Sequence, residues 1–384
     1  MPEPVVRTRL RYIPALDGLR GLSLPGTILT HYALFLQYQR GAPGWLHHVG
    51  PLTLNIQMFF VLSGALITSL LVAEYQRSAD VSMRKFYLRR SRRLGPALVV
   101  VLPAMALAEL AWTGTGASSP LGTHPWLALG SVAVFLGNWR LFRVSGGIGW
   151  LGPAWTLGIE EQFYLTWPLG LRALLRRRAS RAAVHLALGA ALVTGIGIAT
   201  VLYAHFAPSR TFYATPTQLP SILAGCALGY ELTANGSGRL ARVLRSRLLA
   251  LAGLAGMVVA SIEMARRTSF AYRGGYLVYA ALACLLIGHC FVRAAEPTVI
   301  TRVFGWKPFV VIGQISYEAY LVHTIVILAV ARAWPTLTVY RMMALDTVIV
   351  AVSSGLFYYL IERPIRRRGW RAAFRPGARP APAG

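Results

Sequence analysis

The chain has 384 residues, of which 55% are hydrophobic and 14% charged, and its formal net charge at pH 7 is +26. Soluble domains carry roughly a quarter of charged residues, so this composition excludes a soluble globular domain and favours a polytopic membrane protein. The Lys and Arg residues stand in short runs between apolar blocks, as positive-inside anchors do, which excludes a nucleic-acid-binding surface.

Ten apolar segments are predicted to cross the membrane as helices, which gives an all-α bundle with both termini in the cytoplasm. An eleventh segment, Trp126–Leu141, is predicted to be re-entrant or interfacial, because its crossing would place one basic cluster outside. The ten predicted spans are Leu16–Leu36, Leu52–Val72, Leu94–Trp112, Trp155–Leu175, Ala183–Tyr203, Gln218–Leu232, Leu248–Met264, Tyr276–Val292, Phe309–Val330 and Met343–Ile361. The basic clusters expected in the cytoplasm are Arg84–Arg93, Arg172–Arg181, Arg239–Arg247, Arg293–Lys307 and Arg363–Arg375.

We expect one membrane domain over residues 1–364 and a basic, disordered cytoplasmic tail over residues 365–384. The first apolar segment has no small-residue cleavage site and is expected to remain as a span. The three cysteines lie in apolar segments without metal-like spacing, so they predict neither a disulfide framework nor a metal site.

The first span carries three ionisable residues, Asp17, Arg20 and His31. Ionisable side chains are costly inside a membrane, so each is a candidate for function. Asp17 and Arg20 can pair on one helix face. His31 follows Arg20 by eleven residues, which places it on that face about 16 Å further along. The spacing fits an interface arginine with a core histidine, or a cation for an anionic ligand with a base that accepts a hydroxyl proton.

The fourth crossing span begins with a dense polar insertion in Trp155–Leu165, which contains Glu160, Glu161 and Tyr164. Two adjacent carboxylates point about 100° apart on a helix, so they cannot face one cavity equally. One carboxylate is expected to face a cavity, unless the pair caps the preceding loop. Tyr164 is a candidate for contact with substrate.

The second span places Asn55 and Gln57 near its external end, where we expect them to line a cavity and contact substrate. Ser63 and Gly64 follow in mid-membrane, where small residues allow close helix approach, so we expect both to serve packing. His323, in the ninth span, is a further candidate for contact with substrate.

The basic run Arg84–Arg93 allows two interpretations. It is a cytoplasmic anchor on anionic lipid, or it binds a phosphorylated cofactor, because guanidinium groups match the geometry of phosphate. The sequence contains no P-loop, GxSxG elbow, HExxH or CxxC motif, so no motif supports a nucleotide-driven transporter, a hydrolase or a metalloenzyme.

Together these motifs resemble those of the acyltransferase-three family, integral membrane O-acyltransferases of bacteria and animals. They occur in the family's order over nearly the whole chain, and the resemblance implies a core of ten spans. The residues that carry the resemblance are Tyr12–Gly21, the Arg20 and His31 spacing, Phe59–Gly64, Phe86–Arg93, Trp155–Tyr164, Ile315–His323 and Ile361–Pro364.

The resemblance implies transfer of an acyl group, often acetyl, from acyl-CoA to a hydroxyl, without a metal. It implies that His31 is the essential histidine, that Arg20 is its partner and that Glu160 or Glu161 is the required carboxylate. From the residues themselves, Asp17 is expected to orient Arg20 towards an anionic ligand and to contact substrate.

The resemblance also places the acyl-CoA contact on the basic run, with Arg89 and Arg92 foremost, Arg93 beside them and Arg20 as a further contact. The chain departs from the family at Gln218, where many members have an arginine, so a ligand contact of that arginine is not expected here. No SGNH-type esterase domain follows, so we expect no relay through such a domain.

The expected location is the bacterial cell membrane, with multiple crossings and contact with membrane lipid. The acceptor is a hydroxyl of a glycan, a glycolipid or a secondary metabolite such as a macrolide. The alternative is a polytopic transporter or flippase for a glycosidic or lipid substrate, although the sequence has no inverted repeat typical of transporters.

Overall fold

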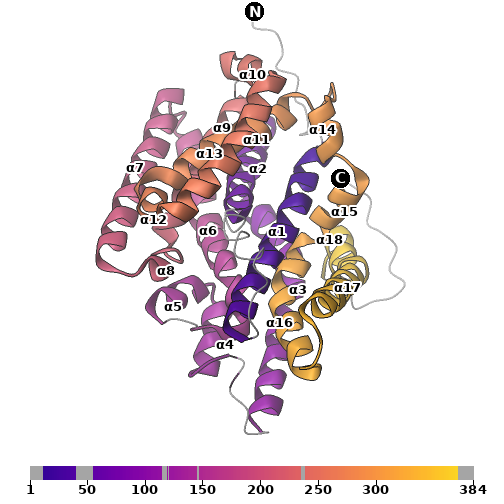
Figure 1. Cartoon of the computed structure of the whole chain (residues 1–384). Helices are drawn as coiled ribbons and strands as arrows, with labels where there is room; N and C mark the ends of the chain where they lie inside the picture. The colour runs from indigo at the N-terminus through magenta and orange to yellow at the C-terminus, as the bar shows by residue number, and fades with distance from the viewer. Residues whose placement is uncertain are drawn as a thin grey trace, which may run out of the picture. The chain divides into compact units, whose positions relative to one another are not determined.

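The structure of the chain is a computed structural model. It describes residues 12–39, 55–114, 119, 121–144, 147–234 and 238–370. Every regular element in these ranges is a helix, and none is a strand (Figure 1). The predicted all-α class is therefore confirmed for the described part of the chain.

The chain divides into two compact units, each built from two stretches of sequence. The first unit comprises Met1–Val81 and Ile159–Gln314, and the second comprises Ser82–Gly158 and Ile315–Gly384.

The first unit is a pack of long helices joined by short ones (Figure 1). Its helices are α1 (Pro14–Gln39), α2 (Asn55–Ser78), most of α6 (Trp155–Arg176), α7 (Arg181–His205), α8 (Pro208–Thr211), α9 (Thr215–Ala234), α10 (Arg239–Leu244), α11 (Arg247–Arg266), α12 (Thr268–Phe270), the π-turn η3 (Ala271–Gly275), α13 (Tyr276–Val292), α14 (Val299–Phe304) and α15 (Lys307–Gln314).

Glycines bring α2 and α9 into backbone contact. A Cβ atom on Gly64 would overlap the carbonyl oxygen of Ile222, and one on Gly225 would overlap the carbonyl oxygen of Val61. Small residues at a helix interface allow the backbones to approach closely in a membrane. The packing role predicted for Gly64 is thereby confirmed.

Glycines also bring α1 into backbone contact with the last helices of the first unit. A Cβ on Gly18 would overlap the carbonyl oxygen of Phe304, and one on Gly21 would overlap that of Phe309. Pro25 lies inside α1 and has no N–H to donate to the Gly21 carbonyl. The start of α1, which carries Asp17 and Arg20, is therefore fixed against α14 and α15.

Polar contacts join α2 and its following turn to α6. Trp167 Nε1 donates a hydrogen bond to Thr68 Oγ1 at 2.9 Å. The Arg172 guanidinium donates to both carboxylate oxygens of Asp80, at 2.9 and 2.7 Å. This bidentate bond holds the pKa of Asp80 below its ordinary value, because it stabilises the charged carboxylate.

The second unit contains the basic run at the start of its longest helix, where Ser82 Oγ caps α3 by accepting from the Lys85 backbone N–H at 3.4 Å. Its elements are α3 (Met83–Thr113), α4 (Pro125–Ala133), α5 (Gly137–Arg143), the 3-10 turn η2 (Gly149–Ala154), the first turn of α6, α16 (Ser316–Ala333), α17 (Val339–Phe357), the π-turn η4 (Tyr358–Glu362) and α18 (Arg363–Arg368).

Six helices among the described residues are long and apolar enough to cross a membrane, and α15 with α16 would add a seventh. The six are Ile56–Ser78, Met83–Thr113, Arg181–His205, Arg247–Arg266, Thr268–Val292 and Val339–Arg368. The predicted spans in α1, α6 and α9 are helices of 26, 22 and 20 residues that carry polar side chains. Ten crossings with cytoplasmic termini therefore stay a prediction.

The segment Trp126–Leu141 forms two short helices, α4 of nine residues and α5 of seven. Between them, Phe135 has a φ of 60°, a left-handed conformation that ends a helix. About 20 helical residues are needed to cross a bilayer, so neither helix is long enough alone.

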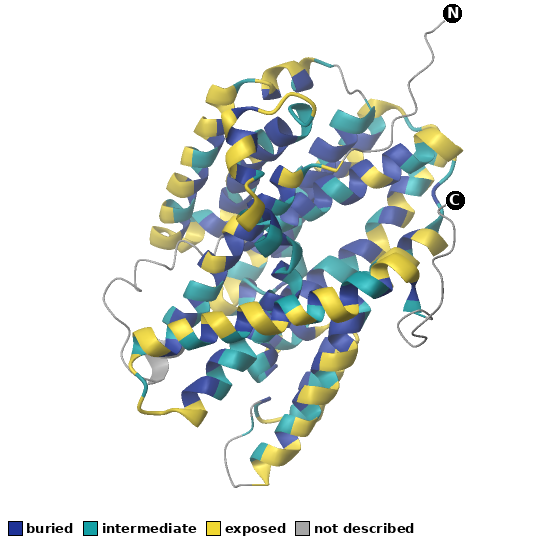
Figure 2. Ribbon diagram, turned by 90° about the vertical axis from the view of Figure 1, so that its right-hand side faces the viewer, coloured by how far each residue is buried: buried dark blue, intermediate teal, exposed yellow. Residues whose placement is uncertain are grey.

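Exposed apolar side chains cover the outward sides of several helices, and Figure 2 shows buried and exposed residues alternating along them. On α7, Leu186 and Val193 are 74% and 69% exposed, and on α11 Leu248 is 78% exposed. Soluble proteins rarely expose such continuous apolar surface. These helices have the character of lipid-facing spans, and the chain is a multi-pass membrane protein.

Candidate functional site

A cluster of four polar residues lies at the start of α1. Arg20 Nη1 donates to Asp17 Oδ1 at 2.9 Å, which confirms the predicted pair. Tyr12 donates its hydroxyl proton to Asp17 Oδ2 at 2.7 Å, and Gln314 Nε2 donates to the Tyr12 hydroxyl at 3.4 Å. The Arg20 side chain is 12% exposed, so Asp17 fixes a largely buried cation at the entrance of α1.

His31 lies on the same helix, three turns further along. Its Nδ1 is 2.9 Å from the carbonyl oxygen of Thr27. A carbonyl only accepts, so this contact assigns the proton of the neutral ring to Nδ1 and leaves the lone pair on Nε2. An imidazole in this tautomer is arranged to accept a proton at Nε2.

Glu160 is held by two hydroxyl groups. Ser63, on α2, donates to Glu160 Oε1 at 2.9 Å. Tyr164, one turn along α6, donates to Glu160 Oε2 at 3.1 Å and lies 3.3 Å from Ser63 Oγ. The structure thus brings the predicted residues Glu160 and Tyr164 together. The neighbouring Glu161 points about 100° away around the helix and does not share this arrangement.

Gln57 belongs to a separate buried network between α2 and α9. Its Nε2 donates to Gln218 Oε1 at 2.6 Å, and its Oε1 accepts from the Ser221 hydroxyl. Gln218, at the position where the family often has arginine, also donates to the Phe212 carbonyl oxygen. These contacts make Gln57 a link between helices, and its contact with substrate stays a prediction. The side chain of Asn55 lies outside the described residues.

The second unit holds the remaining predicted site residues. On α3, Arg89 is exposed, whereas Arg92 and Arg93 are half-buried. On α16, His323 is buried, and its Nδ1 lies 2.7 Å from the Tyr320 carbonyl oxygen. His323 is therefore hydrogen-bonded within its own helix.

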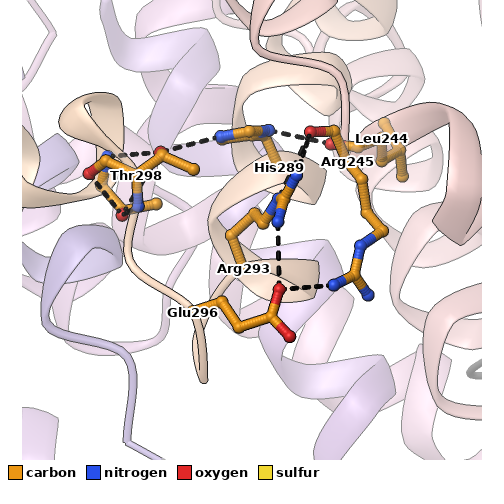
Figure 3. Close-up of polar contacts among 7 residues, drawn as sticks. Leu244, Arg245, His289, Arg293, Glu296 and Thr298 are labelled. Atoms are coloured by element: carbon orange, nitrogen blue, oxygen red, sulfur yellow. Dashed lines mark hydrogen bonds and ion pairs between the residues drawn. The ribbon is translucent and has the colours of Figure 1, made fainter.

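His289 is hydrogen-bonded through both ring nitrogens at a junction of helices (Figure 3). Its Nδ1 lies 2.9 Å from the Leu244 carbonyl oxygen, and its Nε2 lies 3.0 Å from Thr298 Oγ1, the N-cap of α14. Beside it, Glu296 accepts from Arg293 at 3.0 Å and from Arg245 at 2.6 Å. Both ring nitrogens serve the junction of α10, α13 and α14.

No group of three or more His, Cys, Asp or Glu residues in the described ranges is arranged to hold a metal ion. Cys226 and Cys290 are buried free thiols, and Cys284 is a half-buried one.

Comparison with known families finds a match over almost the whole chain. The profile of a family described as an acyltransferase domain matches residues 13–372. The chain belongs to this acyltransferase-three family. The matched range includes α1 with Arg20 and His31, α6 with Glu160, and the basic start of α3.

Curated relatives are similar over nearly all of this acyltransferase-family chain. A putative peptidoglycan O-acetyltransferase of Bacillus subtilis is 30% identical, covering 94% of this chain and 56% of its own length. An O-acetyltransferase of Staphylococcus aureus is 27% identical over 95% of this chain and 59% of its own. A peptidoglycan O-acetyltransferase of Listeria monocytogenes is 28% identical over 94% and 57%. The chain therefore spans little more than half the length of these relatives. No solved structure matches it.

Ser63 is the member of the Glu160 cluster that sequence reasoning assigned differently. The packing role expected for Ser63 is incomplete, because its hydroxyl donates to a carboxylate 97 positions away. Its neighbour Gly64 provides the packing with α9. Adjacent helix residues point about 100° apart, so Ser63 faces a different neighbour from Gly64.

Proposed function

We propose that the chain is a membrane O-acyltransferase that moves an acetyl group from acetyl-CoA to a hydroxyl of peptidoglycan. The family match over residues 13–372 supports acyl transfer, and the similarity to peptidoglycan O-acetyltransferases supports acetyl as the group and peptidoglycan as the acceptor. The proposed location is the inner membrane of a bacterium, where the protein contacts lipid.

The observation that carries the proposal is the place of His31 on α1, three turns beyond the pair of Asp17 and Arg20. With Nδ1 bonded to the Thr27 carbonyl, Nε2 is the nitrogen that acts as general base or nucleophile. His289 bonds through both nitrogens at a helix junction away from this pair. We therefore assign the chemistry to His31.

Acyl transfer can follow either of two balanced routes. In direct transfer, His31 Nε2 takes the proton of the acceptor hydroxyl, the oxygen attacks the thioester carbon, and the C–S bond breaks. The imidazolium then returns its proton to the leaving thiolate. In the covalent route, Nε2 attacks the thioester carbon first, the C–S bond breaks and the thiolate leaves. The acceptor hydroxyl then attacks the acyl carbon, the C–N bond breaks, and the hydroxyl proton passes to the thiolate. Labelled acetyl-CoA without acceptor separates the routes, since only the covalent route labels the protein.

The residues around this chemistry have proposed roles that follow from their contacts. Arg20, fixed by Asp17, provides a positive charge for the anionic donor. Glu160, held by Ser63 and Tyr164, retains free lone pairs on its carboxylate oxygens and accepts a hydrogen bond from the acceptor or stabilises the imidazolium.

For the donor, we propose that Arg89, Arg92 and Arg93 bind the phosphate groups of acetyl-CoA through guanidinium hydrogen bonds. Asn55, Gln57, Tyr164 and His323 are kept as proposed contacts of the acceptor.

The test is acetyl transfer by purified protein, read by mass spectrometry of peptidoglycan fragments. We expect transfer with acetyl-CoA and wild-type protein, and a loss of about 10²–10⁴-fold for His31→Ala, since general bases contribute about that much in rate. His205→Ala is the matched control, because His205 is exposed at the end of α7. Wild-type activity in His31→Ala would refute the mechanism, and glycan export without acetylation would favour a flippase.

A further inference from the structure

The C-terminal turn of the second unit lies against the basic start of α3. A Cβ on Gly95 of α3 would come within 2.8 Å of Cζ2 in the Trp370 ring. Gly369 is next to the Arg92 side chain, and a Cβ there would lie 3.0 Å from Arg92 Nη2. Gly369 adopts a φ of 83°, which L side chains rarely take, and this turn brings Trp370 back onto α3.

Arg92 lies on the face of α3 that this turn covers, because Gly369 packs against its guanidinium group. Arg89 precedes Arg92 by three residues and is its neighbour on the helix surface. Arg92 lies under the turn, and Arg89 is one turn nearer the start of α3. The exposed arginines of α18, Arg366, Arg367 and Arg368, come just before Gly369.

The combined charge of the two segments is strongly positive. The run Arg84–Arg93 holds six basic residues, and Arg363–Arg368 holds four. Neither run contains a carboxylate. Glu362 directly precedes the second run, and Arg366 donates to it at 3.1 Å. Arg93 acts electrostatically on the same carboxylate.

One atom in this region indicates a missing ligand. Arg92 Nε is buried and has no hydrogen-bond partner within the described structure. A buried guanidinium N–H without a partner is costly, and an anion that accepts from it would remove the cost. Phosphate accepts from two guanidinium N–H groups at once, which suits arginines presented from two segments.

We propose that Arg366, Arg367 and Arg368 form the second wall of a phosphoryl-binding site whose first wall is Arg89 and Arg92 on α3. Gly369 and Trp370 hold the two walls together. The phosphoryl groups belong to the donor or to the headgroup of an anionic lipid. The identification of the ligand as the acyl donor rests on the proposed function. The existence of a phosphoryl-binding site does not.

The test uses full-length protein in nanodiscs of neutral lipid, with coenzyme A as the probe. The variant R366Q/R367Q/R368Q should raise the Kd for coenzyme A by about tenfold or more and reduce its salt dependence. The matched control is R176Q/R177Q/R178Q, which removes the same charge from three exposed arginines in the first unit. The control should change the Kd less than twofold. The double variant R367Q/R368Q leaves the pair of Arg366 with Glu362 intact and should show an intermediate loss.

A second arm distinguishes the source of the phosphoryl group. Nanodiscs containing phosphatidylglycerol are analysed by native mass spectrometry for lipid retained on the protein. If the triple variant binds coenzyme A normally but retains less phosphatidylglycerol than the control, the site binds a lipid headgroup. If both measurements match the control, the proposed site is refuted. Acetyl transfer is measured in parallel. An active wild type refutes the site alone if the triple variant is unaffected in acetyl transfer, coenzyme A binding and lipid retention. An inactive wild type refutes the function alone if the triple variant still changes coenzyme A binding or lipid retention.

Discussion

Because α2 and α9 are in backbone contact, we predict that replacing glycine by alanine destabilises the protein in α9 and stabilises it in α7. In Gly225→Ala the new Cβ would overlap the Val61 carbonyl oxygen and lie 2.9 Å from the Ala65 amide nitrogen. Both are backbone atoms, so no side chain can turn away and the helices must separate. Overpacking costs about 1–3 kcal/mol, and replacing glycine in a helix by alanine returns about 0.5–1 kcal/mol. We expect a net loss of about 1–2 kcal/mol in unfolding free energy.

Gly197→Ala, on α7, is the matched control, because a Cβ there meets no atom within 4 Å. It should stabilise the protein by about 0.5–1 kcal/mol, the helix-propensity gain alone. The assay is thermal unfolding in detergent with a thiol-reactive fluorescent dye, since Cys226 and Cys290 are buried until the protein unfolds. At about 2–4 °C per kcal/mol, Gly225→Ala lowers the midpoint and Gly197→Ala raises it. Equal shifts in the same direction would refute the close packing of α2 with α9.

Two further predictions concern polar contacts of α6. Ser63→Ala and Tyr164→Phe should each lower kcat about tenfold, because each removes one of the two hydroxyl donors that hold Glu160. In acetyl-transfer kinetics, the double variant should lose less than the product of the two single losses. Multiplicative losses would show that the hydroxyls act independently. The bidentate bond from Arg172 lowers the pKa of Asp80, so its stabilisation is present above the unfolded carboxyl pKa of about 4 and is lost as the pH falls below it. Thermal midpoints between pH 3 and 7 should therefore fall more steeply on acidification for wild type than for Asp80→Asn, and parallel curves would contradict this.

The sequence predicted features that depend on neighbours along one helix. The Asp17 and Arg20 pair follows from three-residue spacing, and the close approach at Gly64 follows from the absence of a side chain. Helices occupy the predicted spans for the same reason, since apolar blocks of sufficient length determine them.

Features that depend on contacts between distant segments could not be predicted from the sequence. The partner of Ser63 lies 97 positions away, and nothing in its own span distinguishes a packing serine from a hydrogen-bond donor. The ninth predicted span, Phe309–Val330, is two helices, because α15 ends at Gln314 and α16 begins at Ser316. The apolar blocks on either side of Gln314, Ser316 and Glu318 are close enough to be predicted as one span, so the break was missed.

The helix α15, which packs against α1, is synthesised long after α1, and this order has a consequence for biogenesis. Tyr12 and Gln314, which join the start of α1 to α15, are 302 positions apart. At roughly 5–20 residues per second, the ribosome needs tens of seconds to synthesise the intervening chain. During that interval α1 carries Asp17, Arg20 and His31, each expensive in lipid, without its final neighbour. The helix that bears the proposed base therefore completes its packing only after α14 and α15 have been synthesised.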